Sequence, residues 1–481
     1  MSRKYFGTDG IRGEYGVEPL TPEFFKILGF AIGKSLLSSK NCEKKVIFGQ
    51  DTRESCQNII EALSIGLLEA DCLVYEAGVV PTPAISYFTK EEFIPINDEK
   101  MMAQRRVKIE HFDLGIMVSA SHNLYKDNGI KIFNNKGFKI SKEDENHIED
   151  YIDSIRNKDI KWSFNETTLK SGDDEKADIR YIGEMAIRGY IDFCSSTLPK
   201  KIKKTNLTLD LANGSNWSIG EAVFIDAGFN IEAGFNINVI NNTPNGKNIN
   251  EKCGSTYLNV LPKIIKKNNS KFGISVDGDG DRIVIVNKEG KTLDGDDILY
   301  TIIRGKILEG ESIRGVVGTV MTNRALENFL NEENIDFIRA NVGDKNVLEK
   351  MIENKYDLGG ETSGHILMLK LLPSGDSMIA ALQFLYYSDI LEKNNINNFL
   401  DKYPQKITNL LGDRNLSDNI SNIVIKKAID KFSTNKLRLV IRKSGTENCI
   451  RIMVEAKDSE VVEKISYEIG EFIKYEVKKL S

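Results

Sequence analysis

The 481-residue sequence is poor in several features that would place it in a special class of proteins. Six cysteines are scattered without a CxxC pair, which indicates reduced thiols or small core residues in a reducing compartment. No apolar run approaches the roughly 18 residues that a membrane helix needs, and the basic N-terminus lacks the apolar stretch of a secretory signal. Lysine and arginine number 65 and the acidic residues 70, and this near balance argues against nucleic acid or an anionic membrane as a partner. We therefore expect a cytoplasmic protein.

The sequence is rich in short apolar segments that end abruptly in glycine, serine, aspartate or asparagine. Hydrophobic residues make up 41% of the chain, which is enough for several cores. The segments predicted to be strands are residues 46–49, 114–118, 207–211, 272–276 and 316–320. A helical stretch usually follows, and strands that alternate with helices indicate an α/β fold whose polar chemistry lies where the strands end. The C-terminal part differs, because strands at 437–441 and 450–455 precede an amphipathic helix that begins near Glu460.

Charged and polar stretches suggest where the chain divides. Residues 157–176 resemble a linker, residues 290–295 could end a second unit, and residues 389–404 could precede a last one. These boundaries predict α/β units at 1–165, 166–291 and 292–395 and a smaller C-terminal unit at 396–481. We expect residues 94–112 to form a surface excursion, and the asparagine clusters near 236–250 to be loop rather than function.

An acidic loop, residues 277–281, carries the most specific signal. Its aspartates Asp277, Asp279 and Asp281 alternate with glycines, and in an extended chain such side chains point to one side. Oxygen ligands without histidine or cysteine favour Mg²⁺ or Mn²⁺ over zinc. A calcium-binding EF-hand is excluded because its sixth and twelfth positions hold Arg282 and Lys288. A solvated acidic turn is the alternative, although carboxylates this close would repel one another without a cation.

A serine-containing segment, residues 119–131, follows another predicted strand. Ser121 lies beside His122, and Lys131 ends the segment. The residues around Ser121 do not match the GxSxG elbow of an esterase. A serine here could instead carry a phosphoryl group beside the metal, where the cation offsets the developing charge. Taken alone, a turn rich in serine and asparagine is more typical of a helix cap.

Two further loops lie at strand ends. Residues 442–447 read Arg-Lys-Ser-Gly-Thr-Glu, with Arg451 following, and this mixture of cations, hydroxyls and exposed backbone suits a phosphate group. A solvated basic hairpin is the alternative for this loop. Residues 359–365 contain Glu361, Ser363 and His365, which offer the mixed donors and acceptors that sugar hydroxyls require. A structural histidine is the alternative for His365.

These loops, in this order and at this separation, resemble the α-D-phosphohexomutase family over essentially the whole chain. The segments that carry the resemblance are residues 3–13, 342–344, 360–365 and 442–447, together with the serine and acidic loops. They are most similar to the bacterial subgroup that acts on glucosamine phosphates. The resemblance implies three similar mixed α/β domains in series and a smaller α+β C-terminal domain, which together surround a central cleft.

The resemblance also implies roles for individual residues. Ser121 would be phosphorylated and would share one Mg²⁺ with Asp277, Asp279 and Asp281. Glucosamine 6-phosphate and glucosamine 1-phosphate would be interconverted through a 1,6-bisphosphate, on the route to UDP-N-acetylglucosamine and the cell wall. The other matching residues are Arg12, His122, Lys131, Arg282 and His365 near the reacting groups, Glu361 and Ser363 at the sugar, and Arg442, Ser444, Gly445, Thr446 and Arg451 at the phosphate. Lys131 could act as a base only with a lowered pKa.

The resemblance leaves several alternatives open. Leu124 and Asn448 stand where the family usually has proline, so the rigidity of two loops is in doubt. The sugar could be mannose or glucose, or the protein could bind sugar phosphates without catalysis. A phosphatase with an aspartate nucleophile would leave the loops of Ser121 and Arg442 without a role. The expected partners are a small sugar phosphate and a hexosamine or glucose 1,6-bisphosphate activator, with no nucleic acid or membrane, and a homodimer is compatible with the resemblance.

Overall fold

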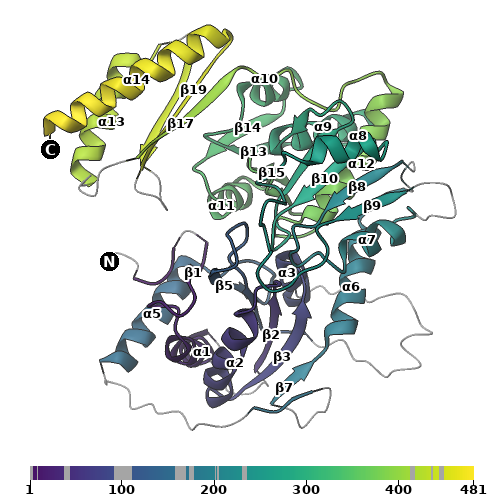
Figure 1. The fold of residues 1–481 in the computed structure, drawn as a ribbon, viewed down its shortest axis with the longest axis vertical. Coiled ribbons are helices and arrows are strands. Elements are labelled where there is room, and N and C mark those ends of the chain that lie inside the picture. Colours follow the sequence, from purple (N-terminus) through teal and green to yellow (C-terminus); the bar gives the residue numbers. More distant parts are fainter. Residues whose placement is uncertain are drawn as a thin grey trace.

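The computed structural model describes residues 4–7, 9–36, 44–90, 111–157, 169–172, 178–200, 202, 205–229, 236–411, 418–434, 437–443 and 449–480. Most of the predicted excursion at 94–112 and of the linker at 157–176 lies outside these residues, as do Ser444, Gly445, Thr446 and Asn448. The described chain forms four sheets with helices packed beside them (Figure 1). We refer to the parts built around these sheets as the first, second, third and C-terminal units.

The first unit contains a seven-stranded mixed sheet in the order β1-β5-β4-β2-β3-β7-β6. Its strands are β1 (Ile11–Glu14), β2 (Lys44–Gln50), β3 (Cys72–Val79), β4 (Leu114–Val118), β5 (Asp127–Asn134), β6 (Ser171–Gly172) and β7 (Ile179–Tyr181). The helices are α1 (Pro22–Leu36), α2 (Cys56–Glu69), α3 (Thr82–Thr89) and α5 (Lys142–Arg156). Strand side chains alternate between two cores: Val46 and Phe48 face α1 and α2, whereas Ile47 faces α3.

The second and third units have smaller mixed sheets, in the orders β12-β11-β10-β8-β9 and β14-β13-β15-β16. The strands are β8 (Leu207–Asp210), β9 (Ile237–Ile240), β10 (Phe272–Val276), β11 (Ile283–Asn287), β12 (Thr292–Leu293), β13 (Gly315–Thr319), β14 (Asp336–Ala340), β15 (Leu358–Gly360) and β16 (Ile366–Met368). The helices are α6 (Gly183–Ser196), α7 (Gly220–Asp226), α8 (Leu261–Lys267), α9 (Gly295–Leu308), α10 (Arg324–Glu332), α11 (Asp344–Asn354) and α12 (Ser377–Lys393).

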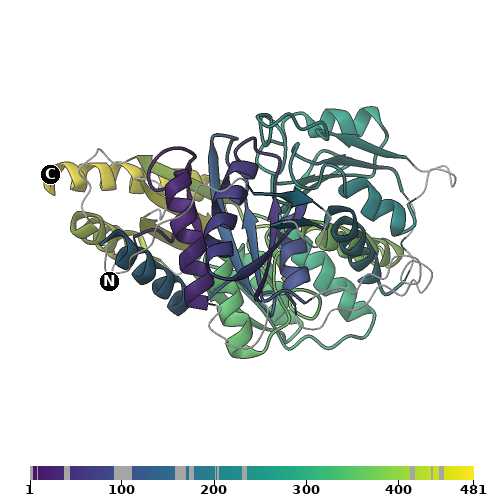
Figure 2. The same ribbon diagram turned by 90° about the horizontal axis from the view of Figure 1, so that it is seen from below.

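The C-terminal unit is an antiparallel sheet in the order β17-β19-β18 with a core of its own. It consists of β17 (Gln405–Leu411), α13 (Asp418–Phe432), β18 (Leu437–Lys443), β19 (Cys449–Ala456) and α14 (Ser459–Leu480). Figure 2 shows this unit at one end of the molecule and the second unit at the other. The described architecture therefore confirms the predicted fold class of three mixed α/β units in series and an α+β unit after them.

The sheets cross two of the predicted boundaries. Strands β6 and β7 follow residue 165, but β6 pairs with β7 and β7 pairs with β3, so the first sheet extends to Tyr181. Strand β12 follows residue 291 but pairs with β11 of the second sheet. The chain becomes polar before these strands have ended, yet their backbones still pair with the preceding sheet. A polar stretch is therefore a poor guide to where a sheet ends.

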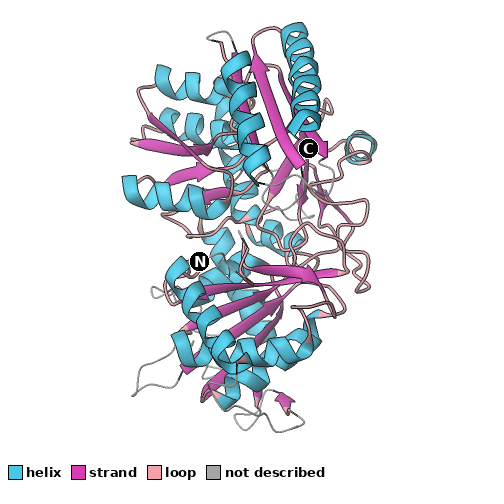
Figure 3. Cartoon of the chain, turned by 90° about the vertical axis from the view of Figure 1, so that its left-hand side faces the viewer, coloured by secondary structure: helices cyan, strands magenta, loops and turns pink. Residues whose placement is uncertain are grey.

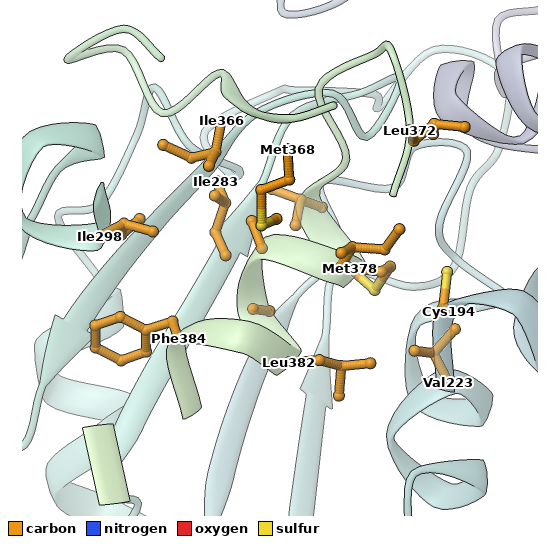
Figure 4. Packing of buried hydrophobic residues seen from close by; sticks show 14 of the residues in the cluster. Cys194, Val223, Ile283, Ile298, Ile366, Met368, Leu372, Met378, Leu382 and Phe384 are labelled. Atoms are coloured by element: carbon orange, nitrogen blue, oxygen red, sulfur yellow. The ribbon is translucent and has the colours of Figure 1, made fainter. Parts of the chain in front are cut away.

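One apolar core runs through the first three units. Helix α12 contributes many of its residues to this core, and almost every side chain on it is buried. Figure 4 shows Met378, Leu382 and Phe384 of this helix near Ile283 of β11 and Met368 of β16. Figure 3 shows the first sheet in the lower half of the molecule and the other sheets in the upper half. Because the three units share this core, their loops are held in fixed positions relative to one another.

Each site loop predicted from the sequence connects two antiparallel neighbours. The Ser121 loop joins β4 to β5, the aspartate loop joins β10 to β11, and the loop of Glu361 and His365 joins β15 to β16. The predicted pattern of strand followed by helix is thus wrong after Val118, where the chain returns as β5. A fourth such connection, between β18 and β19, contains the predicted phosphate loop.

No helix in the part of the chain that the structure describes has both the length and the apolar character needed to span a bilayer. The described cysteines Cys56, Cys72, Cys194 and Cys253 are buried free thiols.

Candidate active site

Ser121 lies at the end of β4 with its side chain turned toward the second unit. The residue is 1% exposed and has a positive φ of 53°, which is uncommon for a residue other than glycine. Its hydroxyl donates a hydrogen bond to Asp277 Oδ2 at 2.7 Å, and His122 Nδ1 lies 3.3 Å from the same oxygen. The predicted nucleophile and the predicted acidic loop therefore meet, although they lie in different units.

The carboxylates of Asp277, Asp279 and Asp281 form a buried cluster. One oxygen from each lies within 4.8 Å of the others. The chain forms a turn at residues 278–281, where Gly280 has a φ of 73°. The expectation of an extended acidic segment is therefore wrong: the carboxylates converge because the backbone turns around them. Glycine allows this turn because it has no Cβ to oppose a positive φ.

The cluster has the chemistry of a divalent cation site. Asp279 Oδ1 and Asp281 Oδ1 are buried without a hydrogen-bond partner among the described residues. Burial, together with the neighbouring charges of Asp281 and Asp279, raises the pKa of Asp277 well above its usual value. A small cation with oxygen ligands would satisfy the unpartnered atoms and remove this repulsion. The donor set, three carboxylates and the nearby Ser121 hydroxyl, fits Mg²⁺ better than a metal that needs nitrogen or sulfur.

Lys131, on β5, is a buried cation within this cluster. Its Nζ lies 2.6 Å from Asp279 Oδ2, 2.8 Å from Asp281 Oδ2 and 3.6 Å from Asp9 Oδ2. Burial alone would lower the pKa of Lys131, but these three carboxylates outweigh it and raise the pKa well above its usual value. The lowered pKa that a basic Lys131 requires is therefore absent from this arrangement, in which the side chain is an ammonium ion.

The arginines and His122 supply further polar groups beside Ser121. Arg282 Nη1 lies 3.4 Å from His122 Nδ1, and Arg12 pairs with Asp9. Burial, with help from Arg282 and Arg12, lowers the pKa of His122 to about 4, so this imidazole is neutral near pH 7. The two guanidinium groups keep their charge, and their buried Nε atoms lack a hydrogen-bond partner among the described residues.

His365 and Glu361 come from the third unit. The two ring nitrogens of His365 lie 3.8 Å from Asp281 Oδ1 and 3.8 Å from Asp344 Oδ2. Burial would lower the pKa of His365, but Asp281 and then Asp344 outweigh it and raise the pKa. Glu361 Oε1 accepts a hydrogen bond from the backbone of Gly343 at 2.9 Å, and its carboxylate is among the charges that raise the pKa of Arg282.

The exposed Ser363 lies in the same loop as Glu361. Between them, the Thr362 hydroxyl lies 3.2 Å from Asp296 Oδ1 at the start of α9. The Thr362 backbone carbonyl accepts from Gly295, so the loop rests on the first turn of that helix. Ser363 is therefore the more accessible of the two hydroxyls.

The predicted phosphate loop is described only at its edges. Arg442 on β18 and Arg451 on β19 are direct partners across the antiparallel ladder. Arg451 Nε donates to Asn409 Oδ1 on β17 at 2.9 Å. The two arginines therefore lie side by side at the end of the C-terminal sheet from which the phosphate loop leaves.

Several residues without a predicted role complete the site. Thr82 Oγ1 donates to Asp279 Oδ2 at 2.6 Å, and Lys139 pairs with both Asp9 and Asp344. Asp9 and Asp344 stand in segments similar to the family, which is the signal that could have found them. Thr82 follows a proline at the start of α3 and carries no such signal.

Two more residues hold the backbone of the Ser121 loop. Arg53, which follows β2, and Asn250 each donate to the carbonyl oxygens of Ser121 and Asn123. Asn250 belongs to the stretch that we expect to be loop rather than function, and its side-chain amide contacts the serine loop. A separate cavity of about 200 Å³, lined by residues such as Thr197, Tyr356 and Tyr387, contains none of the predicted site residues.

Comparisons with known proteins agree with this fold. Models of phosphoglucomutase/phosphomannomutase match the chain at residues 3–159 (α/β/α domain I), 294–406 (α/β/α domain III) and 398–471 (C-terminal domain). These matches define a phosphohexomutase, an enzyme of the isomerase class. The chain belongs to the phosphoglucomutase/phosphomannomutase family.

Curated relatives resemble the chain along nearly its whole length. A phosphoglucosamine mutase of Neisseria meningitidis serogroup B is 37% identical over 98% of this chain and 100% of its own. One from Vibrio vulnificus is 37% identical over 98% of both chains.

Solved structures show the same fold at lower identity. A phosphoglucomutase/phosphomannomutase family protein from Burkholderia thailandensis has a TM-score of 0.76 at 20% identity, over 99% of this chain and 98% of its own. An N-acetylphosphoglucosamine mutase from Aspergillus fumigatus, solved in complex with GlcNAc-6P and magnesium, has a TM-score of 0.60 at 16% identity, over 98% and 96%.

Proposed function

We propose that the enzyme interconverts glucosamine 6-phosphate and glucosamine 1-phosphate, with Ser121 as the residue that carries the phosphoryl group. The observation that carries the proposal is the 2.7 Å hydrogen bond from Ser121 Oγ to Asp277, inside a buried cluster of three carboxylates. The names of the curated relatives support glucosamine as the sugar. The product would supply the synthesis of UDP-N-acetylglucosamine for the cell wall.

The proposed reaction consists of two phosphoryl transfers and uses no oxidant or reductant. A free hydroxyl of the sugar phosphate attacks the phosphorus of phosphoserine, so the Ser121 Oγ–P bond breaks as the new O–P bond forms. The resulting 1,6-bisphosphate turns around in the site. Ser121 Oγ then attacks its other phosphate, which restores phosphoserine and releases the isomer. In each transfer the attacking hydroxyl loses a proton and the leaving oxygen gains one, so no proton is released overall. His122 Nδ1, 3.3 Å from Ser121 Oγ, is placed to exchange this proton with the serine oxygen.

Positive groups of the chain would stabilise the transferring phosphoryl group. Lys131, Arg12 and Arg282 all keep their charge in this site. Phosphorylation adds about −1.5 to −2 charge near pH 7, which three buried aspartates would oppose. A divalent cation such as Mg²⁺, held by Asp277, Asp279, Asp281 and an oxygen on Ser121, would supply the remaining positive charge. His365 and Asp344 would orient this group of charges from the third unit.

The ends of the sugar phosphate would be held by different units. Glu361 and Ser363 are proposed to contact the sugar hydroxyls. Arg442 and Arg451 on neighbouring strands, with Ser444, Gly445 and Thr446 of the loop between them, are proposed to hold the phosphate that is not reacting. This grip must accept either phosphate, so it would depend on charge and hydrogen bonds rather than on the shape of the ring.

The test is an activity assay with a serine control. The purified enzyme, given Mg²⁺ and a hexose 1,6-bisphosphate as the first phosphoryl donor, should convert glucosamine 6-phosphate to the 1-phosphate. Ser121→Ala should abolish turnover. Ser154→Ala on α5 should retain it, because the Ser154 hydroxyl donates to the Asp150 carbonyl of its own helix and bonds to no other described residue. Turnover by the Ser121→Ala variant at a rate near that of the unmodified enzyme would refute the proposal.

Other outcomes would select among the neighbouring functions. A higher kcat/KM for mannose or glucose phosphates would assign a phosphomannomutase or phosphoglucomutase. Intact-mass analysis should show a phosphate retained on the active protein and absent from Ser121→Ala. A protein that binds sugar phosphates without turnover or serine phosphate would be a silent member of the family. Release of inorganic phosphate in place of isomer would indicate a phosphatase.

A further inference from the structure

Ser121 is held in a backbone conformation that its own side chain disfavours. Its φ of 53° lies in the left-handed region, where the Cβ of an ordinary residue meets the following carbonyl. Such conformations persist only where surrounding contacts hold them in place, and they cluster at functional sites. The contacts that hold this one are therefore candidates for a role in the reaction.

Four hydrogen bonds converge on two carbonyl oxygens of the loop. Arg53 Nη2 lies 3.2 Å from the Ser121 oxygen and 2.6 Å from the Asn123 oxygen. Asn250 Nδ2 lies 2.8 Å and 2.9 Å from the same two oxygens. Each nitrogen carries two hydrogens, so each can donate once to each carbonyl. We call this arrangement of Arg53 and Asn250 the carbonyl clamp.

The amide of Ser121 is fixed from the other side by groups connected to the clamp. Ser121 N donates to Ser119 Oγ at 2.9 Å, and Ser119 Oγ donates to Asp51. Asp51 pairs with Arg53, and the side chains of that pair are fully buried. The amide and the carbonyl of Ser121 are thus joined through one closed set of side chains, which leaves the backbone little freedom to rotate.

The carbonyl clamp also links the two loops whose contact forms the site. Arg53 belongs to the first unit. Asn250 belongs to the second, where its backbone N–H donates to the Ala212 carbonyl. A Cβ on Gly278, in the aspartate loop, would lie 2.7 Å from Asn250 Nδ2 and 2.7 Å from the Ser121 oxygen. The aspartate loop therefore packs directly against the clamp, and only glycine leaves room for that packing.

We propose that Arg53 and Asn250 are positioning residues that keep Ser121 left-handed and so hold its Oγ at the carboxylate cluster. Both bind the backbone carbonyls rather than Oγ. Their loss moves the phosphoryl-carrying oxygen relative to the aspartates and lowers the rate of transfer, with little effect on sugar binding. The inference rests on the proposed function, because it assigns a consequence to the placement of Ser121.

Asn250→Ala tests the clamp, and Asn241→Ala is its matched control. Asn250 and Asn241 are both left-handed, with φ of 58° and 52°, and both lie in the second unit. Asn241 Nδ2, however, donates to Asp210 at 2.9 Å, away from the serine loop. Alanine removes two side-chain hydrogen bonds at Asn250 and one at Asn241, and at both positions it replaces a residue that tolerates the left-handed conformation. Activity with Mg²⁺ and hexose 1,6-bisphosphate, melting temperature and amide hydrogen exchange over residues 119–124 are measured for both variants.

We expect Asn250→Ala to lower kcat by about tenfold to a hundredfold with KM changed less than about twofold. The rate of amide hydrogen exchange over residues 119–124 should rise in this variant. Asn241→Ala should change neither kcat nor this exchange rate. Arg53→Lys keeps a cation opposite Asp51 but cannot reach both carbonyls, so its kcat should fall as well. An unchanged kcat in a folded Asn250→Ala variant, or equal losses in both asparagine variants, would overturn the inference.

The proposed function and the inference fail in different ways. If Ser121→Ala keeps its activity, the proposed function is wrong whatever the clamp does. If Ser121→Ala is inactive and Asn250→Ala has normal kcat and normal exchange, only the clamp is wrong. The exchange measurement needs no substrate, so it reports on the loop independently of catalysis.

Discussion

Replacing Lys131 by methionine would remove the only buried ammonium ion that the described structure places between Asp279 and Asp281. The lysine side chain is 1% exposed, and its Nζ lies 2.6 Å and 2.8 Å from the two carboxylates. Methionine keeps a similar length and apolar stem but no charge. The variant therefore leaves buried carboxylates facing one another without a cation, which is the more costly part of breaking a buried ion pair.

The size of the effect follows from that burial. Removing one partner of a buried ionic group costs about 3 to 5 kcal/mol. For a unit of roughly 150 to 250 residues, 1 kcal/mol corresponds to about 2 to 4 °C in melting temperature, so we expect a loss of about 6 to 20 °C without metal. Mg²⁺ should raise the melting temperature of the variant more than that of the unmodified protein, because the cation replaces the missing positive charge. Saturation at about 100 times the Kd would contribute about 2.7 kcal/mol.

The assay is thermal unfolding in EDTA and in excess Mg²⁺. We expect the gap in melting temperature between Lys131→Met and the unmodified protein to narrow when Mg²⁺ is present. Lys139→Met is the control, because that lysine pairs with Asp9 and Asp344 outside the aspartate loop, and its gap should not depend on Mg²⁺. A loss below about 2 °C in EDTA, or a gap of the same size in both conditions, would refute the reasoning.

Three other perturbations test separate parts of the structure. Burial raises the pKa of Asp376 to about 6 from 3.8, so its contribution to stability is full below pH 3.8 and is lost as pH rises to about 6. Asp376→Asn can still accept the hydrogen bonds from the first turn of α12 but cannot titrate. The free energy of unfolding, measured by chemical unfolding between pH 4 and 7, should therefore depend less on pH in this variant. Gly278→Ala should lower kcat at least tenfold because its Cβ would meet the Ser121 carbonyl, and a normal rate would contradict the packing described. Arg438→Met removes the hydrogen bonds to Val320 and Thr322 and leaves the buried Glu455 carboxylate without its cation, with the Arg324 backbone N–H as a remaining donor. Limited proteolysis should then release the C-terminal unit faster, and an unchanged rate would exclude Arg438 as its attachment.

Much of the fold could be predicted because the strands are short, apolar and clearly ended. The predicted strands at 114–118 and 272–276 coincide with β4 and β10, and the predicted helix near Glu460 is α14 from Ser459. Their apolar residues are buried on both faces of a sheet, which produces runs that are easy to recognise. The polar residues that follow them could be predicted as site loops for the same reason.

The rest could not be predicted because it depends on contacts between distant segments. Asn250 lies among many asparagines, and only the fold shows that its amide reaches the Ser121 loop, 129 residues away. The ammonium state of Lys131 depends on carboxylates from two units, which no spacing in the sequence reveals. Arg53 and Asn250 also donate to the carbonyl of Asn123, the residue before Leu124, where the family usually has proline. Leu124 itself is exposed.

The connection of each site loop to two antiparallel neighbours has a consequence for changing the enzyme. Both ends of the loop between β15 and β16 are fixed, since Gly360 pairs with Ile366 across the ladder. Within the loop, Glu361 and His365 contact Gly343 and Asp281. Thr362 and Ser363 are therefore the positions that can be exchanged while the anchor points stay where they are. Since the proposed function places Ser363 at the sugar, directed evolution of sugar preference could be confined to these two positions, while the serine and the aspartates remain untouched on other hairpins.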